Sequence, residues 1–184
     1  QGPGTSPLAI HDCMAALQWL VDNRGELQLD FDRVVVSGAS AGGHLALTTG
    51  LAATNSNLGH DVTVSVDAIV NWYGITDIAA VATFLDSTRP GGNYARTWVG
   101  GGDLDSVSAD WSPVRMLHDA SPPILTIHGD ADTVVPHSQA RLLHDELASR
   151  GRPGMLLTLD GGNHSGFSHE QYVEAWDTVF DFLG

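Results

Sequence analysis

The 184-residue sequence is poor in cysteine and in basic residues, and each shortage excludes a class of protein. Cys13 is the only cysteine, so no disulfide forms within the chain, and its place in a helical pattern favours packing in the core. Lys and Arg total 8 against 22 Asp and Glu, and the net charge of −14 argues against nucleic acid or an anionic membrane as a partner. No signal peptide or 18-residue apolar run is visible, so localisation stays open.

Two segments resemble a metal-binding or phosphate-binding motif only in part. Asp103 and Asp105 resemble part of a calcium loop, but the ligand spacing is incomplete. The glycines at 100–102 lack the strand–turn–helix setting of a phosphate cradle. The sequence therefore predicts neither a metal nor another cofactor.

The strongest functional signal is the segment Gly38-Ala39-Ser40-Ala41-Gly42. It follows the apolar run 33–36 and opens into a helix-forming segment, which is the order of a nucleophile elbow. Such a turn strains its serine, and we expect both flanking glycines to be needed because a Cβ would collide there. We predict that Ser40 is the nucleophile and that the Ala41 N–H helps to bind an oxyanion.

An acid and a histidine should follow Ser40 in that chain order. The apolar strand 123–127 leads into a loop that carries Asp130 and Asp132. Asp130 follows the strand so closely that an Asx-type bond in the turn is its more natural role, so Asp132 is the preferred acid. His164 lies in a glycine-rich loop after the last strand and is the predicted base.

The other histidines have plainer interpretations. His44 lies one turn into the elbow helix, where we expect packing or support of the site, and His128 should hydrogen-bond its loop. The remaining histidines lie in helix-like or polar contexts and are expected to be solvated: His11, His60, His118, His137, His144 and His169.

Three segments together resemble the α/β-hydrolase esterases, namely residues 37–46, 128–136 and 161–164. The likeness is strongest to the feruloyl/acetyl-xylan esterase-like branch, which is related to the hormone-sensitive-lipase group. The resemblance covers nearly the whole chain from Ile10 onward and implies a catalytic triad of Ser40, Asp132 and His164.

The pattern of elements favours an α/β fold with a mainly parallel sheet flanked by helices and a site at the carboxyl ends of the strands. Apolar residues from Ile10 to Leu20 recur at helical spacing. At 42% apolar residues, the chain is expected to form a single domain over 1–184. Its strands are expected near 33–37, 66–72, 123–128 and 155–159, which resembles the C-terminal half of the α/β-hydrolase fold.

One feature of these esterases is missing. No His-Gly-Gly-Gly-like loop, the source of further oxyanion donors, precedes the elbow, and the chain starts at Gln1 without a methionine. We therefore expect an N-terminally truncated domain whose elbow strand has an unpaired edge. Either a homo-oligomer or an N-terminal partner segment should cover this edge, and without one the esterase should be weak.

Residues 76–119 are the least regular part of the sequence and are expected to form an insertion, in the place of a lid or substrate-binding element. The aromatic residues Trp72, Trp98 and Trp111 are candidates for substrate binding. Packing of the insertion onto the sheet is the plainer interpretation of its aromatic side chains.

These observations favour a carboxylic ester hydrolase that works through an acyl-enzyme. Acetyl or feruloyl esters of plant polysaccharide are the substrates that the resemblance implies. Two alternatives stay open. One is a serine peptidase of the prolyl-oligopeptidase type. The other is a catalytically weak or inactive fragment of the fold that acts as a binding or assembly module.

Overall fold

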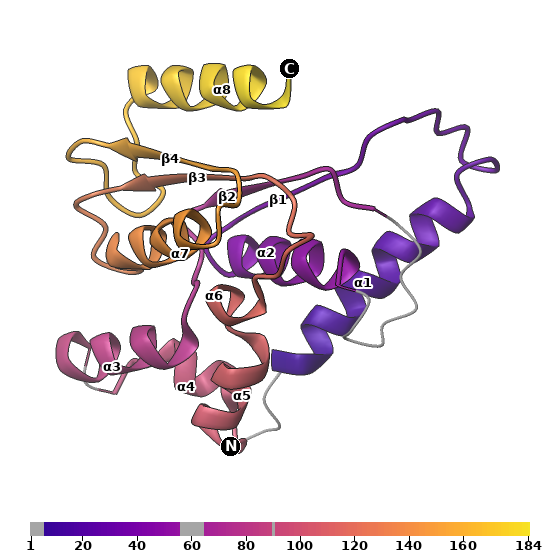
Figure 1. Cartoon of the computed structure of the whole chain (residues 1–184). Helices are drawn as coiled ribbons and strands as arrows, with labels where there is room; N and C mark the ends of the chain where they lie inside the picture. Colours follow the sequence, from indigo (N-terminus) through magenta and orange to yellow (C-terminus); the bar gives the residue numbers. More distant parts are fainter. Residues whose placement is uncertain (1–5, 56–64, 90) are drawn as a thin grey trace.

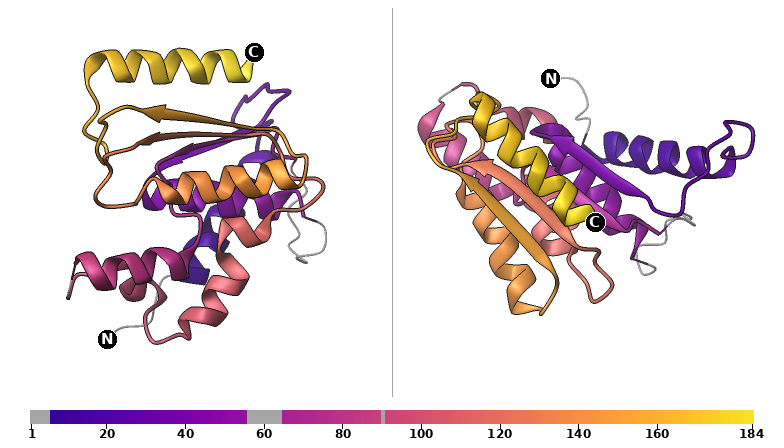
Figure 2. Two further views of the ribbon diagram at one scale, coloured as in Figure 1. Left: turned by 60° about the vertical axis from the view of Figure 1, so that its left-hand side comes forward. Right: turned by 90° about the horizontal axis from the view of Figure 1, so that it is seen from above.

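The computed structural model describes residues 6–55, 65–89 and 91–184, and these form a parallel sheet flanked by helices (Figures 1 and 2). The strands lie in the sheet in the same order as in the chain. They are β1 (Val35–Ala39), β2 (Ala68–Trp72), β3 (Ile124–Gly129) and β4 (Gly154–Leu159). This arrangement confirms the predicted fold class. The first strand lies slightly further along the chain than predicted, so that it ends directly before Ser40.

Helices cover both faces of the sheet, because successive side chains of a buried strand point to opposite faces. Helices α1 (Ser6–Asp22), α2 (Ala41–Ala53) and α7 (Ser138–Ser149) lie on one side, and α8 (His169–Leu183) lies on the other (Figure 1). On the first side Ile69 and Ile124 pack in a cluster with Leu47 of α2. On the second, their neighbours Val70 and Leu125 share a cluster with Val179 of α8.

The segment 76–119, the least regular part of the sequence, is mostly helical in the structure. It contains α3 (Ile78–Thr88), α4 (Tyr94–Val99), α5 (Leu104–Trp111) and α6 (Pro113–Met116). Side chains cap three of these helices, since Asp77, Asn93 and Asp103 accept hydrogen bonds from the amides of Ala80, Arg96 and Ser106. Most of the helices are too short to show a clear apolar period in the sequence. Asp103 is thus engaged as a helix cap, and the lid role of the segment stays a prediction.

Strand β1 lies at the end of the sheet and pairs with β2. Its side chains alternate between half-buried and exposed, and Val35 and Ala39 are on the exposed face. The facing helix α8 exposes 49% of Trp176 and 66% of Phe180. Trp176 lies against Trp72, the register partner of Ala39, with ring centroids 5.2 Å apart. The exposed face of β1 therefore lies on the same side of the sheet as the exposed apolar side chains of α8.

Among the described helices, none is both long and apolar enough to span a bilayer.

Candidate active site

Ser40 occupies the turn between β1 and α2 with φ 57° and ψ −118°, a conformation that is costly for a residue other than glycine. Its amide donates to the carbonyl of Trp72 (2.8 Å), and its carbonyl accepts from the amide of His44 (3.1 Å). The turn is therefore held from the end of β2 as well as by its own helix.

The glycines around Ser40 differ in whether the neighbouring atoms leave room for a Cβ. A Cβ on Gly38 would collide with the carbonyl of Gly42, as expected, whereas a Cβ on Gly42 would meet no atom within 4 Å. The prediction for Gly42 was therefore wrong. Instead Gly43 has the second tight contact, because its Cβ would lie 2.8 Å from the Cα of Gly74. The start of α2 rests directly on the turn after β2.

Three side chains form a continuous hydrogen-bonded row. His164 Nε2 lies 2.9 Å from Ser40 Oγ, and His164 Nδ1 lies 2.7 Å from Asp132 Oδ2. A carboxylate only accepts, so a neutral His164 donates from Nδ1 and can accept the serine proton at Nε2. This row brings together the predicted nucleophile, base and acid. It is the arrangement needed to activate a hydroxyl for attack on a carbonyl carbon.

Asp132 is fully buried and receives four donors. The amides of Val134 (2.7 Å) and Val135 (2.9 Å) donate to Oδ1, whereas His164 and His128 face Oδ2. Burial alone would raise the pKa of Asp132, but the bonds from His128, His164 and the two amides outweigh it and hold that pKa well below its usual range. The carboxylate therefore stays charged.

Asp130 has a different place. Its Oδ1 accepts a hydrogen bond from the Gly161 amide at 2.7 Å, which links the loop after β3 to the loop after β4. This is a structural turn contact of the kind expected from the sequence, and it leaves Asp132 as the carboxylate beside His164.

His128 is fully buried, and its Nε2 lies 2.9 Å from the carbonyl of Val135 and 3.2 Å from Asp132 Oδ2. Since both of these partners are acceptors, Nε2 carries the proton. The expected hydrogen bond to the loop is present, and the same nitrogen also lies near Asp132.

His44 is buried against the insertion. Its Nδ1 lies 3.0 Å from the Ile75 carbonyl, and its ring meets Trp98 edge-on at 4.7 Å. Burial lowers the pKa of His44 to about 4, although the bond to Ile75 opposes this shift. His44 is therefore neutral at pH 7 and packs at the elbow, one of its two expected roles.

Three histidines that were expected to be solvated are half-buried: His118, His137 and His144. Burial lowers the pKa of His144 to about 4, partly opposed by Asp145. The expectation was wrong because helical and polar sequence contexts do not show which helix face is covered. His60 lies outside the described residues.

The three candidate tryptophans make packing contacts. Trp72 is only 8% exposed and packs against Trp176 of α8, which favours packing over substrate contact, and its role in substrate binding stays a prediction. Trp98 packs on His44 and Trp111 on His11, and both are half-buried beside the cluster under α2. An aromatic side chain looks the same in a sequence whether it fills a core or a binding site.

Sequence reasoning missed Tyr73, whose ring centroid lies 4.7 Å from that of His164. The residue directly follows β2, at the same edge of the sheet as the elbow. No motif in the sequence marks it.

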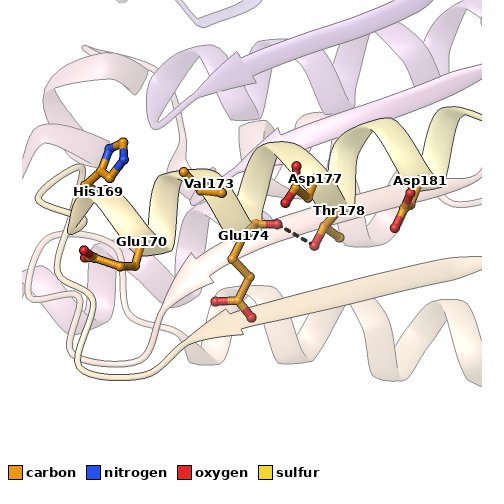
Figure 3. Close-up of a pocket in the computed structure, with 7 residues that line it drawn as sticks. All are labelled: His169, Glu170, Val173, Glu174, Asp177, Thr178 and Asp181. Carbon is orange, nitrogen blue, oxygen red and sulfur yellow. Dashed lines mark hydrogen bonds between the residues drawn. The ribbon is translucent and has the colours of Figure 1, made fainter.

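A shallow hollow lies on the outer surface of α8 (Figure 3). Its side chains are mostly acidic, and none belongs to the row that starts at Ser40. They are His169, Glu170, Val173, Glu174, Asp177, Thr178 and Asp181.

In the part of the chain that the structure describes, no three His, Cys, Asp or Glu side chains are grouped so as to hold a metal ion.

Residues 3–147 match the BD-FAE family. Esterase LipC of Mycobacterium tuberculosis is 33% identical over 172 residues, which cover 86% of this chain and 41% of that protein. Esterase LipQ of the same organism is 26% identical over 186 residues, which cover 98% and 44%. The chain thus spans less than half the length of these curated relatives.

Two solved structures share the fold. A truncated form of a carbohydrate esterase from gut microbiota superposes with a TM-score of 0.75 at 26% identity, covering 94% of this chain and 67% of that one. A puromycin-hydrolyzing peptidase of Mycobacterium tuberculosis gives a TM-score of 0.74 at 26% identity, covering 93% and 24%.

Proposed function

The chain belongs to the BD-FAE family, and from this membership and the geometry at Ser40 we propose that it is a carboxylic ester hydrolase. The observation that carries the proposal is the row of hydrogen bonds from Ser40 through His164 to Asp132. The names of its relatives, Esterase LipQ and Esterase LipC, support the same reaction class.

The proposed reaction has two acyl-transfer steps. Ser40 Oγ attacks the ester carbonyl while His164 Nε2 takes its proton, and His164 then returns this proton to the leaving alcohol. Asp132 keeps the imidazole in the Nδ1–H tautomer and stabilises its cation. Water repeats the sequence on the acyl-enzyme, which releases the acid and restores Ser40.

Charge develops on the carbonyl oxygen, and the Ala41 N–H in the first turn of α2 is the proposed donor. Amides of a first helical turn have no acceptor within the helix and face the positive end of its dipole. Loss of one such donor typically costs about 10²–10³ in turnover. A single donor therefore predicts modest turnover, which a further segment or partner would raise.

For the substrate we propose acetyl or feruloyl esters of plant polysaccharide. The solved structure described as a carbohydrate esterase supports this class, at 26% identity over 94% of the chain. Methyl ferulate and acetylated xylan, compared with short-chain alkyl esters, would show whether the sugar or aromatic part is preferred.

A serine peptidase is the second candidate, because the puromycin-hydrolyzing peptidase shares this fold. Cleavage of a proline anilide at a rate above that of p-nitrophenyl acetate would favour it. A fragment with an inactive site is the third candidate, and the assembled row of Ser40, His164 and Asp132 argues against it.

The exposed edge of β1 supports a proposal about partners. Among the described residues no strand pairs with its outer edge, and Val35 on β1 is exposed, so either a second copy of this chain or an N-terminal segment should cover this edge. No nucleic acid or membrane is proposed as a partner.

The first experiment is hydrolysis of p-nitrophenyl acetate by the chain and by Ser40→Ala. Ser37→Ala is the matched control, because Ser37 is an exposed serine on β1, three residues before Ser40. We expect Ser40→Ala to abolish enzymatic turnover and Ser37→Ala to retain it. Equal rates for Ser40→Ala and the unchanged chain would overturn the proposal.

A further inference from the structure

We propose that Tyr73 is a positioning residue for His164. Its ring fixes the plane in which the imidazole meets Ser40 and Asp132. This inference rests on the proposed ester hydrolysis, and it concerns a residue that lies outside the hydrogen-bonded row.

The backbone of Tyr73 is the first observation. Its φ of 41° lies in the left-handed region, which bulky residues rarely adopt, and the residue is only 8% exposed. Such conformations persist where the surroundings impose them, and they concentrate at functional sites. An observed outlier that touches a proposed catalytic base therefore calls for a functional explanation.

The surroundings impose the conformation from both sides. The Tyr73 amide donates to the Ile127 carbonyl on β3 at 2.8 Å. The preceding carbonyl, that of Trp72, accepts from the Ser40 amide, and the following amide, that of Gly74, donates to Asn71 Oδ1 at 3.0 Å. One short turn thus holds the backbone of the nucleophile and presents a ring to the base.

The ring contacts are the second observation. Tyr73 meets His164 edge-on, with centroids 4.7 Å apart and planes at 67°. It also meets Phe167 at 5.6 Å, from the loop that carries His164, and His128 at 6.4 Å. Edge-on packing is a favourable geometry for aromatic pairs.

The contact supplies a constraint that the hydrogen bonds lack. The hydrogen bonds of His164 to Ser40 and Asp132 tolerate some tilt of the ring plane when the loop that carries the side chain shifts. A neighbouring ring packed against the imidazole blocks this motion. His164 needs such support because its side chain is 15% exposed.

The hydroxyl group of Tyr73 is not required for this role. Burial raises the pKa of Tyr73, and the nearby Tyr172 and Asp132 raise it further, so the ring is neutral at pH 7. A phenylalanine should therefore position His164 as well as the tyrosine does.

Two substitutions separate the ring from the backbone. Tyr73→Phe keeps the ring, whereas Tyr73→Asn removes it and places at this position a residue that tolerates the left-handed region. We expect Tyr73→Phe to keep kcat and KM within about twofold. Tyr73→Asn should lower kcat at least about tenfold with little change in KM, because small misplacements of a base are costly.

A core control distinguishes positioning from loss of stability. Val179→Ala removes buried volume from the same apolar cluster, where Val179 is 4% exposed. It should lower the melting temperature and leave kcat unchanged. If Tyr73→Asn changes only the melting temperature, as this control does, the positioning role is wrong.

A second readout does not depend on activity. The ¹H–¹⁵N imidazole signals of His164 should be one sharp set in the unchanged chain and in Tyr73→Phe, and broadened in Tyr73→Asn. Identical spectra in all three proteins would overturn the proposal. If the unchanged chain hydrolyses esters no faster than Ser40→Ala, the proposed function fails, and the spectra still decide whether Tyr73 fixes the ring.

Discussion

Gly129 and Gly162 lie so close together that a Cβ on Gly129 would collide with the carbonyl oxygen of Gly162. The same carbonyl accepts a hydrogen bond from the amide of Ala131 at 3.0 Å. Asp132 follows the first glycine and His164 follows the second, so this backbone contact holds together the two loops that carry them.

We predict that Gly129→Ala lowers kcat by up to about 10²-fold, because the two loops must separate to admit the methyl group. Gly166→Ala is the matched control, since its Cβ would find the nearest atom, the His164 carbonyl oxygen, 3.9 Å away. Steady-state kinetics on p-nitrophenyl acetate compares the two variants. Equal loss in both would show that the contact at Gly129 does not set the geometry.

Asp132→Asn should keep the fold and lower kcat by about 10⁴-fold, because an amide can present N–H groups to His164 and favour the wrong tautomer. Asp130→Asn should have little effect, since an asparagine oxygen can still accept from the Gly161 amide. Circular dichroism checks the fold and kinetics the rate. Greater loss in Asp130→Asn would mean that the acid has been misassigned.

Ser40→Gly should unfold at higher urea concentration than Ser40→Ala, although both variants are expected to be inactive. The φ of 57° at Ser40 costs about 1–3 kcal/mol of folding free energy for a residue with a Cβ. Glycine adopts this angle with much less strain. At Ser37, in the strand, the order should reverse, with Ser37→Gly less stable than Ser37→Ala. Equal stability of Ser40→Gly and Ser40→Ala would show that the elbow is unstrained.

The free energy of unfolding should decrease as the pH falls from about 6.5 to 4. His44 and His144 have folded-state pKa values of about 4 against the ordinary 6.5, so the unfolded chain binds more protons in this range. The contribution of these two histidines to the free energy of unfolding is fully present above pH 6.5 and is lost as the pH falls to about 4. For His44 it is on the order of 3 kcal/mol, at about 1.4 kcal/mol per pKa unit.

Below pH 4 a further loss should follow. The depressed pKa of Asp132 stabilises the fold above the ordinary value of 3.8, and this stability is lost as the pH drops below it. Urea titrations at several pH values measure both ranges. In His44→Gln the free energy of unfolding should fall less steeply between pH 6.5 and 4. A substitution of the exposed His169 should leave this slope unchanged. An unchanged slope in His44→Gln would contradict this assignment.

If a second copy covers β1, light scattering after size exclusion should show a dimer that dissociates on dilution. Val35→Lys places a charge beside the edge, where Val35 is 37% exposed, and should weaken this dimer. Leu142→Lys on α7, with Leu142 38% exposed, is the control and should not. A monomer at every concentration would leave the N-terminal segment as the proposed cover.

The sequence predicted the sheet well because buried parallel strands are short apolar runs between glycine-rich turns. It also placed Ser40, Asp132 and His164, since their chain order follows from the fold. The helices of 76–119 were missed because their signals are single capping residues. Tyr73 was missed because its role depends on a backbone angle and on a ring that reaches it from a distant loop.

The order of the strands has a consequence for how the protein becomes active during synthesis. Ser40 and His164 are 124 residues apart, and they meet only when the loop after β4 docks. A nascent chain, which emerges from its N-terminus, can form the β1–α2 turn well before His164 is synthesised. Hydrolytic activity should therefore appear late and abruptly, and the growing chain should pose no hazard to cellular esters before that point.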